Sequence, residues 1–153
     1  YGMINDHNKI LEYQQNRDPY LFVDELIEFE AFKYVKATKN LSLDEWFFKV
    51  HWKNDPNMPG FLQCEAIVQA TALAILGNEE NKGKVVYLTK VKDASFLEKV
   101  TPNNKLIIEG YVDSYKRGIA KCHGIASIND KITCKMNFEF IFPDELNKYL
   151  KKP

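Results

Sequence analysis

The sequence predicts an α+β fold in which an antiparallel β-sheet wraps around one long central helix. Residues 61–76 favour a helix of about four turns, because Ala, Leu, Ile, Gln and Glu dominate there. Apolar residues lie on nearly all sides of this segment, as they do in a buried helix. The second half of the chain, by contrast, shows one strand pattern after another. One long buried helix among many strands indicates a sheet packed around that helix.

The first part of the chain predicts a short helix followed by strands. Residues 5–15 form an amphipathic pattern, so we expect the N-terminal segment 1–15 to contain a helix. Residues 21–41 are rich in Phe, Val, Ile and Tyr, and they predict strand with a break near 30–32.

Turn-forming residues mark the ends of the central helix. A capping-box pattern, Ser-Leu-Asp-Glu from Ser42 on, first predicts one helical turn in residues 43–48. The Asn, Asp, Pro and Gly residues of 54–60 then predict turns that lead directly into the helix. A Gly-Asn pair ends it, so we expect the central helix within residues 61–77.

Four further strands are predicted in the second half, at residues 85–91, 105–115, 119–128 and 132–142. The Asn-Asp pair at 129–130 is a hairpin signal between the last two. Every second residue from Ile132 to Phe142 is apolar, while Thr133 and the others between them are mostly polar. One face of this strand is therefore expected to be buried and the other solvated. A short helix is expected within residues 144–152.

Length and composition indicate one globular domain spanning residues 1–153. Hydrophobic residues make up 45% and charged residues 27% of the chain, which is not a disordered composition. The net charge is zero, which gives no electrostatic footprint for a nucleic-acid partner. We recognise neither a membrane span nor an export signal, so we expect a cytoplasmic protein without a membrane partner.

The cysteine pattern fits a reducing compartment. Cys64, Cys122 and Cys134 are widely spaced in apolar contexts, so we expect reduced core thiols rather than disulfides or a zinc site. The sequence shows no cluster of metal ligands and no phosphate-binding glycine loop. We therefore expect neither a metal nor a redox cofactor.

His51 and Glu65 are the candidate reactive residues. His51 lies among aromatic residues just before the turns and the buried helix, whereas His7 is expected at the surface and His123 in a strand. Glu65 occupies the second turn of an otherwise apolar helix, where an unpaired carboxylate is costly. Burial raises the pKa of a carboxyl group, which suits a general acid near neutral pH. The alternatives are a satisfied core histidine and a carboxylate that stabilises the helix N-terminus.

The residues between these two form a recognisable motif. His51 is followed after six residues by Met-Pro-Gly at 58–60, then after four more by Glu65, with Gln69 one helical turn later. This motif resembles the signature of the β-hydroxyacyl-acyl-carrier-protein dehydratases of fatty-acid synthesis. In that family a His and an acidic residue flank Met-Pro-Gly at the same separation.

Two other segments extend the resemblance to residues 16–142. Arg-Asp-Pro-Tyr-Leu-Phe-Val-Asp at 17–24 and the Tyr…Ala-Ser-Phe…Val segment at 87–100 are both similar to family segments. Glu65 matches the FabZ-type, which only dehydrates, whereas the FabA-type carries Asp there and also isomerises the double bond. The Trp-Phe-Phe that begins at Trp46 is more similar to the FabA-type, so isomerisation is left open.

The residues suggest how this chemistry would proceed. Neutral His51 is expected to remove the Cα proton of a thioester, and protonated Glu65 to deliver a proton to the leaving β-hydroxyl. Gly60, at the start of the buried helix, is expected to present its backbone N–H to the thioester carbonyl oxygen. Pro59 and Gln69 are expected to support these groups.

The resemblance also implies a fold and partners. It implies a hot-dog fold and a homodimer in which His51 of one protomer faces Glu65 of the other. The acyl chain would lie in an apolar tunnel along the subunit interface, and FabZ-type enzymes often assemble further into trimers of dimers. The implied partner is an acyl carrier protein.

Departures from the family leave alternatives open. Its Gly-His-Phe-Pro is Val-His-Trp-Lys here at 50–53, and Glu98 stands in its basic carrier-binding run. Nearby lysines form either a displaced basic patch or an ordinary solvated face: Lys84, Lys90, Lys92 and Lys99. One alternative is therefore a specialised acyl product on a dedicated carrier. The others are a hot-dog thioesterase and a non-catalytic acyl-binding or dimerisation module.

Overall fold

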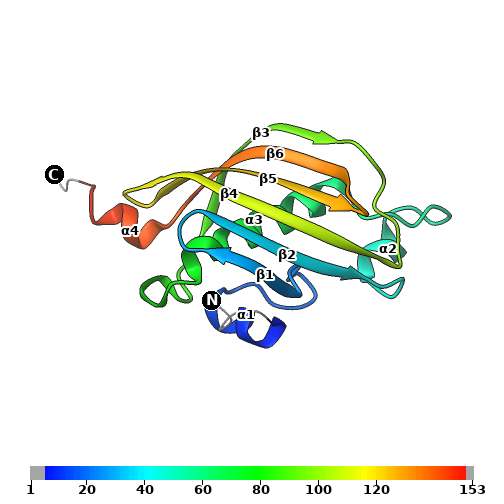
Figure 1. Cartoon of the computed structure of the whole chain (residues 1–153), viewed down its shortest axis with the longest axis horizontal. Coiled ribbons are helices and arrows are strands. Elements are labelled where there is room, and N and C mark those ends of the chain that lie inside the picture. Colours follow the sequence, from blue (N-terminus) through cyan, green and yellow to red (C-terminus); the bar gives the residue numbers. More distant parts are fainter. Residues whose placement is uncertain (1–5, 151–153) are drawn as a thin grey trace.

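Six antiparallel strands form one sheet that curves around a long helix in the computed structural model, which describes residues 6–150 (Figure 1). The strand order is β1-β2-β4-β5-β6-β3. The strands are β1 (Glu25–Glu30), β2 (Tyr34–Leu41), β3 (Tyr87–Phe96), β4 (Asn104–Lys116), β5 (Ile119–Ile128) and β6 (Lys131–Ile141). The helices are α1 (His7–Tyr13), α2 (Trp46–Val50), α3 (Gly60–Leu76) and α4 (Pro143–Asn147), with a 3-10 turn η1 (Glu79–Asn81). This arrangement is the hot-dog fold, and the predicted α+β class is confirmed.

Helix α3 lies directly against the centre of the sheet. All its residues from 66 to 76 are buried. Gly110 on β4 and Gly124 on β5 are register partners beneath the helix. A Cβ atom on Gly110 would collide with Thr71 of α3, and one on Gly124 would collide with Ile67. The two glycines therefore permit the close approach of the helix to the sheet.

Strand β3 is an edge strand whose inner face is uncovered. It lies at the end of the sheet and pairs with β6 (Figure 1). Leu88 and Val91 stand opposite Phe140 and Phe138, whose side chains are buried. Direct cross-strand partners project to the same face of a sheet, yet Leu88 is 45% and Val91 is 46% exposed. The core-facing side of β3 is thus apolar surface that α3 does not cover.

The hairpin between β5 and β6 has the geometry that its residues predict. Asn129 and Asp130 both adopt positive φ angles, of 50° and 66°. Two positive φ angles in a two-residue loop are typical of a type I′ turn, which matches the twist of the flanking strands. The predicted hairpin is confirmed.

The N-terminal helix is shorter than predicted. Its described part begins after Asp6, whose side chain caps it, while residues 1–5 lie outside the described residues. The helix does not extend to the end of the predicted segment 1–15. Gln14 is extended instead, because its side chain hydrogen-bonds to both backbone groups of Asn16. Local side-chain hydrogen bonds of this kind compete with helix formation.

The predicted capping box at Ser42 is wrong. The Ser42 hydroxyl accepts a 3.2 Å hydrogen bond from the backbone N–H of Asp44, which closes a local turn, and α2 begins only at Trp46. Glu45 does not complete a capping box, because its carboxylate accepts a 2.8 Å hydrogen bond from Lys39. The prediction relied on the Glu45 side chain as part of the capping box, but this side chain forms an ion pair with the buried Lys39 instead.

The predicted alternation in β6 fails at its start. Ile132 is 39% exposed and Thr133 is buried, the reverse of the prediction. The register between β5 and β6 shifts at residues 126–127, and such a bulge turns the following side chains over. The Thr133 hydroxyl donates a 2.8 Å hydrogen bond to Gln63 of α3. From Cys134 on, the predicted inward-facing residues are buried.

Other boundaries moved by a few residues. β3 starts later and extends further than the predicted 85–91. Helix α4 ends at Asn147 rather than continuing through 144–152, of which 151–152 lie outside the described residues. All three cysteines are buried free thiols, as predicted. In the described ranges, no helix has both the length and the apolar content that a membrane crossing requires.

Candidate active site

Glu65 is a half-buried carboxyl group on the second turn of α3. Its Oε2 accepts a 2.8 Å hydrogen bond from Nε2 of Gln69. Burial raises the pKa of Glu65 above its ordinary value, and the hydrogen bond from Gln69 opposes part of that rise. Burial also raises the pKa of Tyr20, with a further contribution from the negative charge of Glu65. The environment of Glu65 therefore favours its protonated form, which is the form that can donate a proton.

Gln69 is held by backbone groups of the segment before β1. Its Nε2 donates to the carbonyl oxygen of Tyr20 at 2.8 Å, and its Oε1 accepts from the N–H of Phe22 at 2.8 Å. An amide has one acceptor end and one donor end, so these two bonds fix which end faces Glu65. Gln69, which was predicted as a supporting residue, thus presents its NH₂ group to the carboxyl group of Glu65.

A cleft of about 370 Å³ runs along α3 from Glu65. Its floor consists of Val68, Ala72 and Leu76, which lie on successive turns of the same helix face. Residues 85–88, at the start of β3, line the cleft as well. The carboxyl group of Glu65 is therefore placed at one end of a largely apolar floor.

His51 lies at the C-terminal end of α2. Its Nδ1 is 3.0 Å from the carbonyl oxygen of Asn57. A carbonyl oxygen only accepts hydrogen bonds, so Nδ1 of a neutral His51 carries the proton and Nε2 remains an acceptor. This is the tautomer that a general base needs. The side chain is neither fully buried nor fully exposed.

The turn that carries Asn57 is held by the segment that follows β3. The side-chain NH₂ of Asn57 donates a 2.7 Å hydrogen bond to the carbonyl oxygen of Asp55. The N–H of Met58 donates to Val100 at 2.8 Å, and the Asp55 carboxylate accepts 3.0 Å and 2.8 Å hydrogen bonds from Lys99. The hydrogen-bond partner of the histidine thus depends on contacts with a distant part of the chain.

Gly60 is the first residue of α3, and Pro59 is its N-cap. The carbonyl oxygen of Pro59 accepts hydrogen bonds from Leu62 and Gln63 at 3.0 Å and 3.2 Å. The N–H of Gly60 belongs to the first turn, where backbone donors have no partner within the helix and negative charge is favoured. A Cβ at Gly60 would lie 2.7 Å from the ring of Phe96. This position therefore requires glycine unless that ring moves.

The predicted residues do not meet at one cavity within a single chain. Glu65 and Gln69 line the cleft along α3. Gly60 lines a second hollow of about 280 Å³ together with Asn57, the hydrogen-bond partner of His51. Neither hollow is lined by both predicted reactive residues. Within residues 6–150, no group of three or more His, Cys, Asp or Glu side chains is arranged to hold a metal ion.

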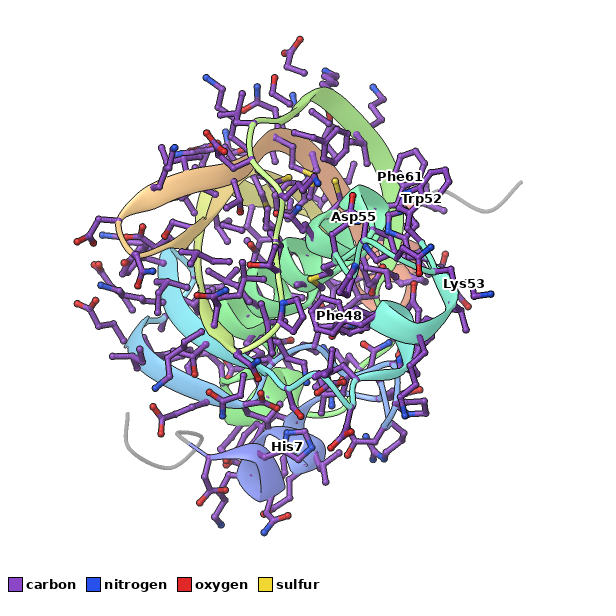
Figure 2. All side chains as sticks on the ribbon, turned by 90° about the vertical axis from the view of Figure 1, so that its right-hand side faces the viewer. His7, Phe48, Trp52, Lys53, Asp55 and Phe61 are labelled. Carbon is purple, nitrogen blue, oxygen red and sulfur yellow. The ribbon has the colours of Figure 1, made fainter. Side chains whose placement is uncertain are left out.

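The labelled side chains of Figure 2 show where these features lie. Trp52, Asp55 and Phe61 are seen at one end of the molecule, where α3 begins, whereas His7 lies on α1 at another side (Figure 2). Trp52 is 61% and Phe61 is 83% exposed, so two large aromatic side chains at this end of the molecule are not buried. Together with β3, they add to the uncovered apolar surface.

The other two histidines differ from their predicted surroundings. His7 is not simply a solvated residue, because its Nε2 lies 2.9 Å from Asp18 and its side chain is 30% exposed. His123 lies in β5 as predicted, but it stacks on Tyr111 with 4.5 Å between ring centroids and bonds to Asp113 at 2.8 Å. Neither lines the cleft that contains Glu65.

Sequence reasoning missed the groups that act through the backbone. The carbonyl oxygens of Asn57 and Tyr20 and the N–H of Phe22 position the predicted residues, yet any residue type offers these groups. The pairing of Lys99 with Asp55 had a weak signal, namely opposite charges in two predicted loops.

Comparison with known proteins now decides the family. Residues 15–137 match the FabA-like domain family. The chain belongs to this family. Similar proteins are the 3-hydroxyacyl-[acyl-carrier-protein] dehydratases FabZ of Thermoanaerobacter pseudethanolicus and of Wolbachia sp. subsp. Drosophila simulans. The first is 36% identical over 140 residues, covering 92% of this chain and 96% of that protein. The second is 39% identical over 128 residues, covering 84% and 87%.

A solved structure supports the fold of this FabA-like protein. The dehydratase heterocomplex ApeI:P from Xenorhabdus doucetiae superposes with a TM-score of 0.74 and covers 94% of this chain and 97% of its own. The sequence identity is 15%, so this likeness shows the hot-dog fold alone. The predicted resemblance to the dehydratase family is confirmed by the family match and the FabZ relatives.

Proposed function

We propose that this FabA-like protein removes water from a (3R)-hydroxyacyl thioester and forms the trans-2-enoyl thioester in fatty-acid biosynthesis. The observation that carries the proposal is the half-buried carboxyl of Glu65, held by Gln69 at one end of an apolar-floored cleft. Its pKa is raised by burial, as a proton donor requires. Relatives that align with most of the chain are FabZ dehydratases, which supports the same reaction.

The proposed reaction begins at His51. Its Nε2 takes the proton from the α-carbon of the substrate, and the electron pair of that C–H bond forms the new C2–C3 double bond. The C3–O bond breaks, and protonated Glu65 gives its proton to the leaving oxygen, which departs as water. His51 and Glu65 then regain their starting states by proton exchange with water. The raised pKa of the half-buried Glu65 carboxyl and the acceptor role of His51 Nε2 are both needed for this division of labour.

Gly60 would stabilise the charge that develops on the thioester carbonyl oxygen. Its N–H has no partner within the helix, and the N-terminus of α3 favours negative charge. Such a preorganised donor stabilises an enolate-like transition state more than the substrate itself. A Cβ atom at this position would collide with the ring of Phe96, so glycine is the residue that fits here.

We propose that the active site is shared between two protomers of a homodimer. Glu65 lines the cleft along α3, whereas His51 does not line it and instead contacts Asn57, which lines the second hollow. The edge of β3 and its uncovered inner face offer a surface that a second copy would bury. Pairing along this edge would place His51 of one protomer near Glu65 of the other. Whether such dimers assemble further into trimers is settled by the mass of the particle in solution.

We propose acyl carrier protein as the partner that delivers the acyl group, as the names of the relatives specify for them. The lysines considered for a displaced patch are paired with acidic groups. Lys90 and Lys92 lie 3.9 Å and 3.5 Å from Glu139, and Lys99 lies 2.8 Å from Asp55. These pairs favour the solvated-face interpretation, so carrier binding is expected to rely on few free cations. The buried free thiols suit a cytoplasmic location.

The ultraviolet absorbance of crotonyl thioester tests the dehydratase function. Purified protein should hydrate the enoyl group, which removes that absorbance, while His51→Ala and Glu65→Gln variants should lose about 10² to 10⁴ of the rate. Circular dichroism of both variants verifies that they are folded. Both coenzyme A and carrier-protein thioesters are assayed.

Two outcomes would replace the proposal. Release of free thiol without enoyl hydration would indicate a thioesterase. A folded protein that is inert on both thioesters would indicate a non-catalytic acyl-binding or dimerisation module. Activity that survives in both variants would remove His51 and Glu65 from the mechanism.

A further inference from the structure

The far end of the cleft along α3 is polar. Gln15, Asn16 and Lys84 line the cleft together with Leu76, the last residue of α3. The side chain of Gln15 donates a 2.7 Å hydrogen bond to the carbonyl oxygen of Gly83, which holds the segment after α1 against the loop after α3. These contacts place the polar groups at the opposite end of α3 from its first turns. The floor between the two ends is apolar.

The ammonium group of Lys84 has one N–H donor that its two neighbouring contacts do not use. Its Nζ donates to Oδ1 of Asn81 at 2.9 Å and lies 3.9 Å from the carboxylate of Glu145. Glu145 is also paired with Lys148 at 3.0 Å, so its charge is shared between two cations. An ammonium group has three N–H donors, and the two contacts of Lys84 leave one for a ligand. The side chain is 22% exposed, so it is largely withdrawn from solvent.

The distance between the two ends of the cleft determines the length of the acyl chain that can join them. An α-helix rises about 1.5 Å per residue, so Glu65 and Leu76 are separated by about 16 Å along α3. Carbon–carbon bonds of about 1.5 Å advance an extended acyl chain by about 1.3 Å per carbon. Because Glu65 acts on the oxygen at C3, the nine carbon–carbon bonds from C3 to C12 span about 12 Å. A terminal oxygen and its hydrogen bond of about 2.9 Å to Lys84 cover the remaining ~4 Å, so an acyl chain of about a dozen carbons joins the two ends.

We propose that this cleft accepts acyl chains of about a dozen carbons whose far end carries an oxygen that accepts a hydrogen bond from Lys84. The inference rests on the proposed dehydratase function, because Glu65 must act on the β-hydroxyl at the near end. A methyl terminus at that depth would remove water from Lys84 and the neighbouring amides without replacing their hydrogen bonds. A terminal hydroxyl would replace one of them. Sites built to bind an oxygen discriminate against analogues that lack it.

The test compares matched pairs of coenzyme A thioesters. One pair is 3-hydroxydodecanoyl and 3,12-dihydroxydodecanoyl thioester, and the other is the corresponding pair with six carbons. We expect the wild-type kcat/KM to favour the terminal hydroxyl by about tenfold or more at twelve carbons. At six carbons the chain does not reach Lys84, so the two substrates should be equal. Lys84→Met should abolish the preference at twelve carbons, and Lys84→Arg should retain it.

Lys82→Met is the matched control, because Lys82 neighbours Lys84 but contacts Glu12 and the ring of Tyr13 instead of the cleft. It should keep the wild-type preference. Equal activity on both twelve-carbon substrates, or a preference that survives in Lys84→Met, would overturn the inference while the dehydratase function stands. Inactivity on the six-carbon pair and on 3-hydroxybutyryl thioester would instead show that the proposed function itself is wrong.

Discussion

Gln69 donates a 2.8 Å hydrogen bond to Glu65 one helical turn earlier, while its amide also binds the backbone of Tyr20 and Phe22. The orientation of the carboxyl therefore depends on a segment that lies far from it in the sequence. Because the bond stabilises the ionised carboxylate, it opposes the rise in pKa that burial causes.

Replacing Gln69 by alanine should therefore change the pH dependence of the reaction as well as its rate. The pKa of Glu65 should rise further, so the alkaline limb of kcat/KM for dehydration should move to higher pH. The rate at the optimum should fall about ten- to hundredfold, since the acid is no longer oriented. Loss of the partner for the buried N–H of Phe22 should destabilise the fold by about 1–3 kcal/mol.

Gln63→Ala is the control for this prediction. Gln63 is a buried glutamine on the same helix, but it accepts a hydrogen bond from Thr133 rather than contacting Glu65. It should reduce stability and leave the alkaline limb unchanged. An alkaline limb that shifts equally in both variants would show that Gln69 acts only through general stability.

The raised pKa of Glu65 also predicts how stability depends on pH. Its folded-state pKa lies above the unfolded value, so the benefit of protonation is fully present below the unfolded pKa. That benefit is lost as the pH rises through the folded-state pKa. Glu65→Gln removes this loss, so the variant should unfold at a higher temperature than the wild type near pH 8 and at a similar one near pH 4. Thermal unfolding across this range measures the difference.

Glu98→Gln serves as the reference in that experiment. Glu98 is an exposed residue paired with Lys131, at the surface rather than in the cleft. Its unfolding temperature should follow that of the wild type across the pH range. A Glu65→Gln curve that also runs parallel to the wild type would mean that burial of this carboxyl does not affect stability.

Gly60→Ala should collide with the ring of Phe96. Overpacking of this kind typically costs about 1–3 kcal/mol, and a shifted N–H should lower kcat more than it changes KM. The double variant Gly60→Ala with Phe96→Ala has room for the added methyl group and should regain stability. Chemical denaturation and steady-state kinetics measure both effects, with Phe96→Ala alone as the reference. A double variant less stable than both single variants would argue against the steric explanation.

The pair of Asp55 and Lys99 should influence activity more than stability. Both side chains are at least half exposed, and such ion pairs contribute about 0–1 kcal/mol. Lys99→Met should nevertheless lower kcat several-fold, because the pair holds the turn whose carbonyl oxygen at Asn57 binds His51. Asp55→Asn should have a similar effect, and the double variant should be no worse than either. Additive losses in the double variant would indicate two independent roles.

A shared active site predicts complementation between inactive variants. In a mixture of His51→Ala and Glu65→Gln chains that exchange subunits, each mixed dimer contains one site with both residues intact. Activity should therefore return to about a quarter of the wild-type value in an equal mixture. The two variants are unfolded and refolded together, and each is refolded alone as the control. A mixture that stays as inactive as its components would place both residues in one protomer.

The sequence predicted most accurately those features that depend on the local conformation of the backbone, such as helix ends and tight turns. Helix α3 lies within one residue of its predicted ends, because turn-forming residues precede it and Gly77 follows it. The hairpin at Asn129 and Asp130 was also predictable, since these residue types tolerate positive φ. The spacing of His51 and Glu65 identified the family, which the comparisons confirm.

Features that depend on distant partners were not predictable in the same way. Thr133 is buried because a bulge in β6 and the hydrogen bond that its hydroxyl donates to Gln63 act together, and neither is visible in the alternation of the strand. Likewise, α2 starts late because Glu45 binds Lys39. The position of His51 relative to Asn57 required the fold of the turn between them. In each case the deciding contact lies outside the local pattern.

The two glycines beneath α3 have a consequence for how this protein could be redesigned. Gly110 and Gly124 determine how closely the helix approaches the sheet, and the helix carries both Glu65 and the floor of the cleft. A methyl group added at either glycine would push the helix away from the sheet. The dimensions of the substrate channel are thus controlled partly from the layer behind it, by residues that no substrate touches.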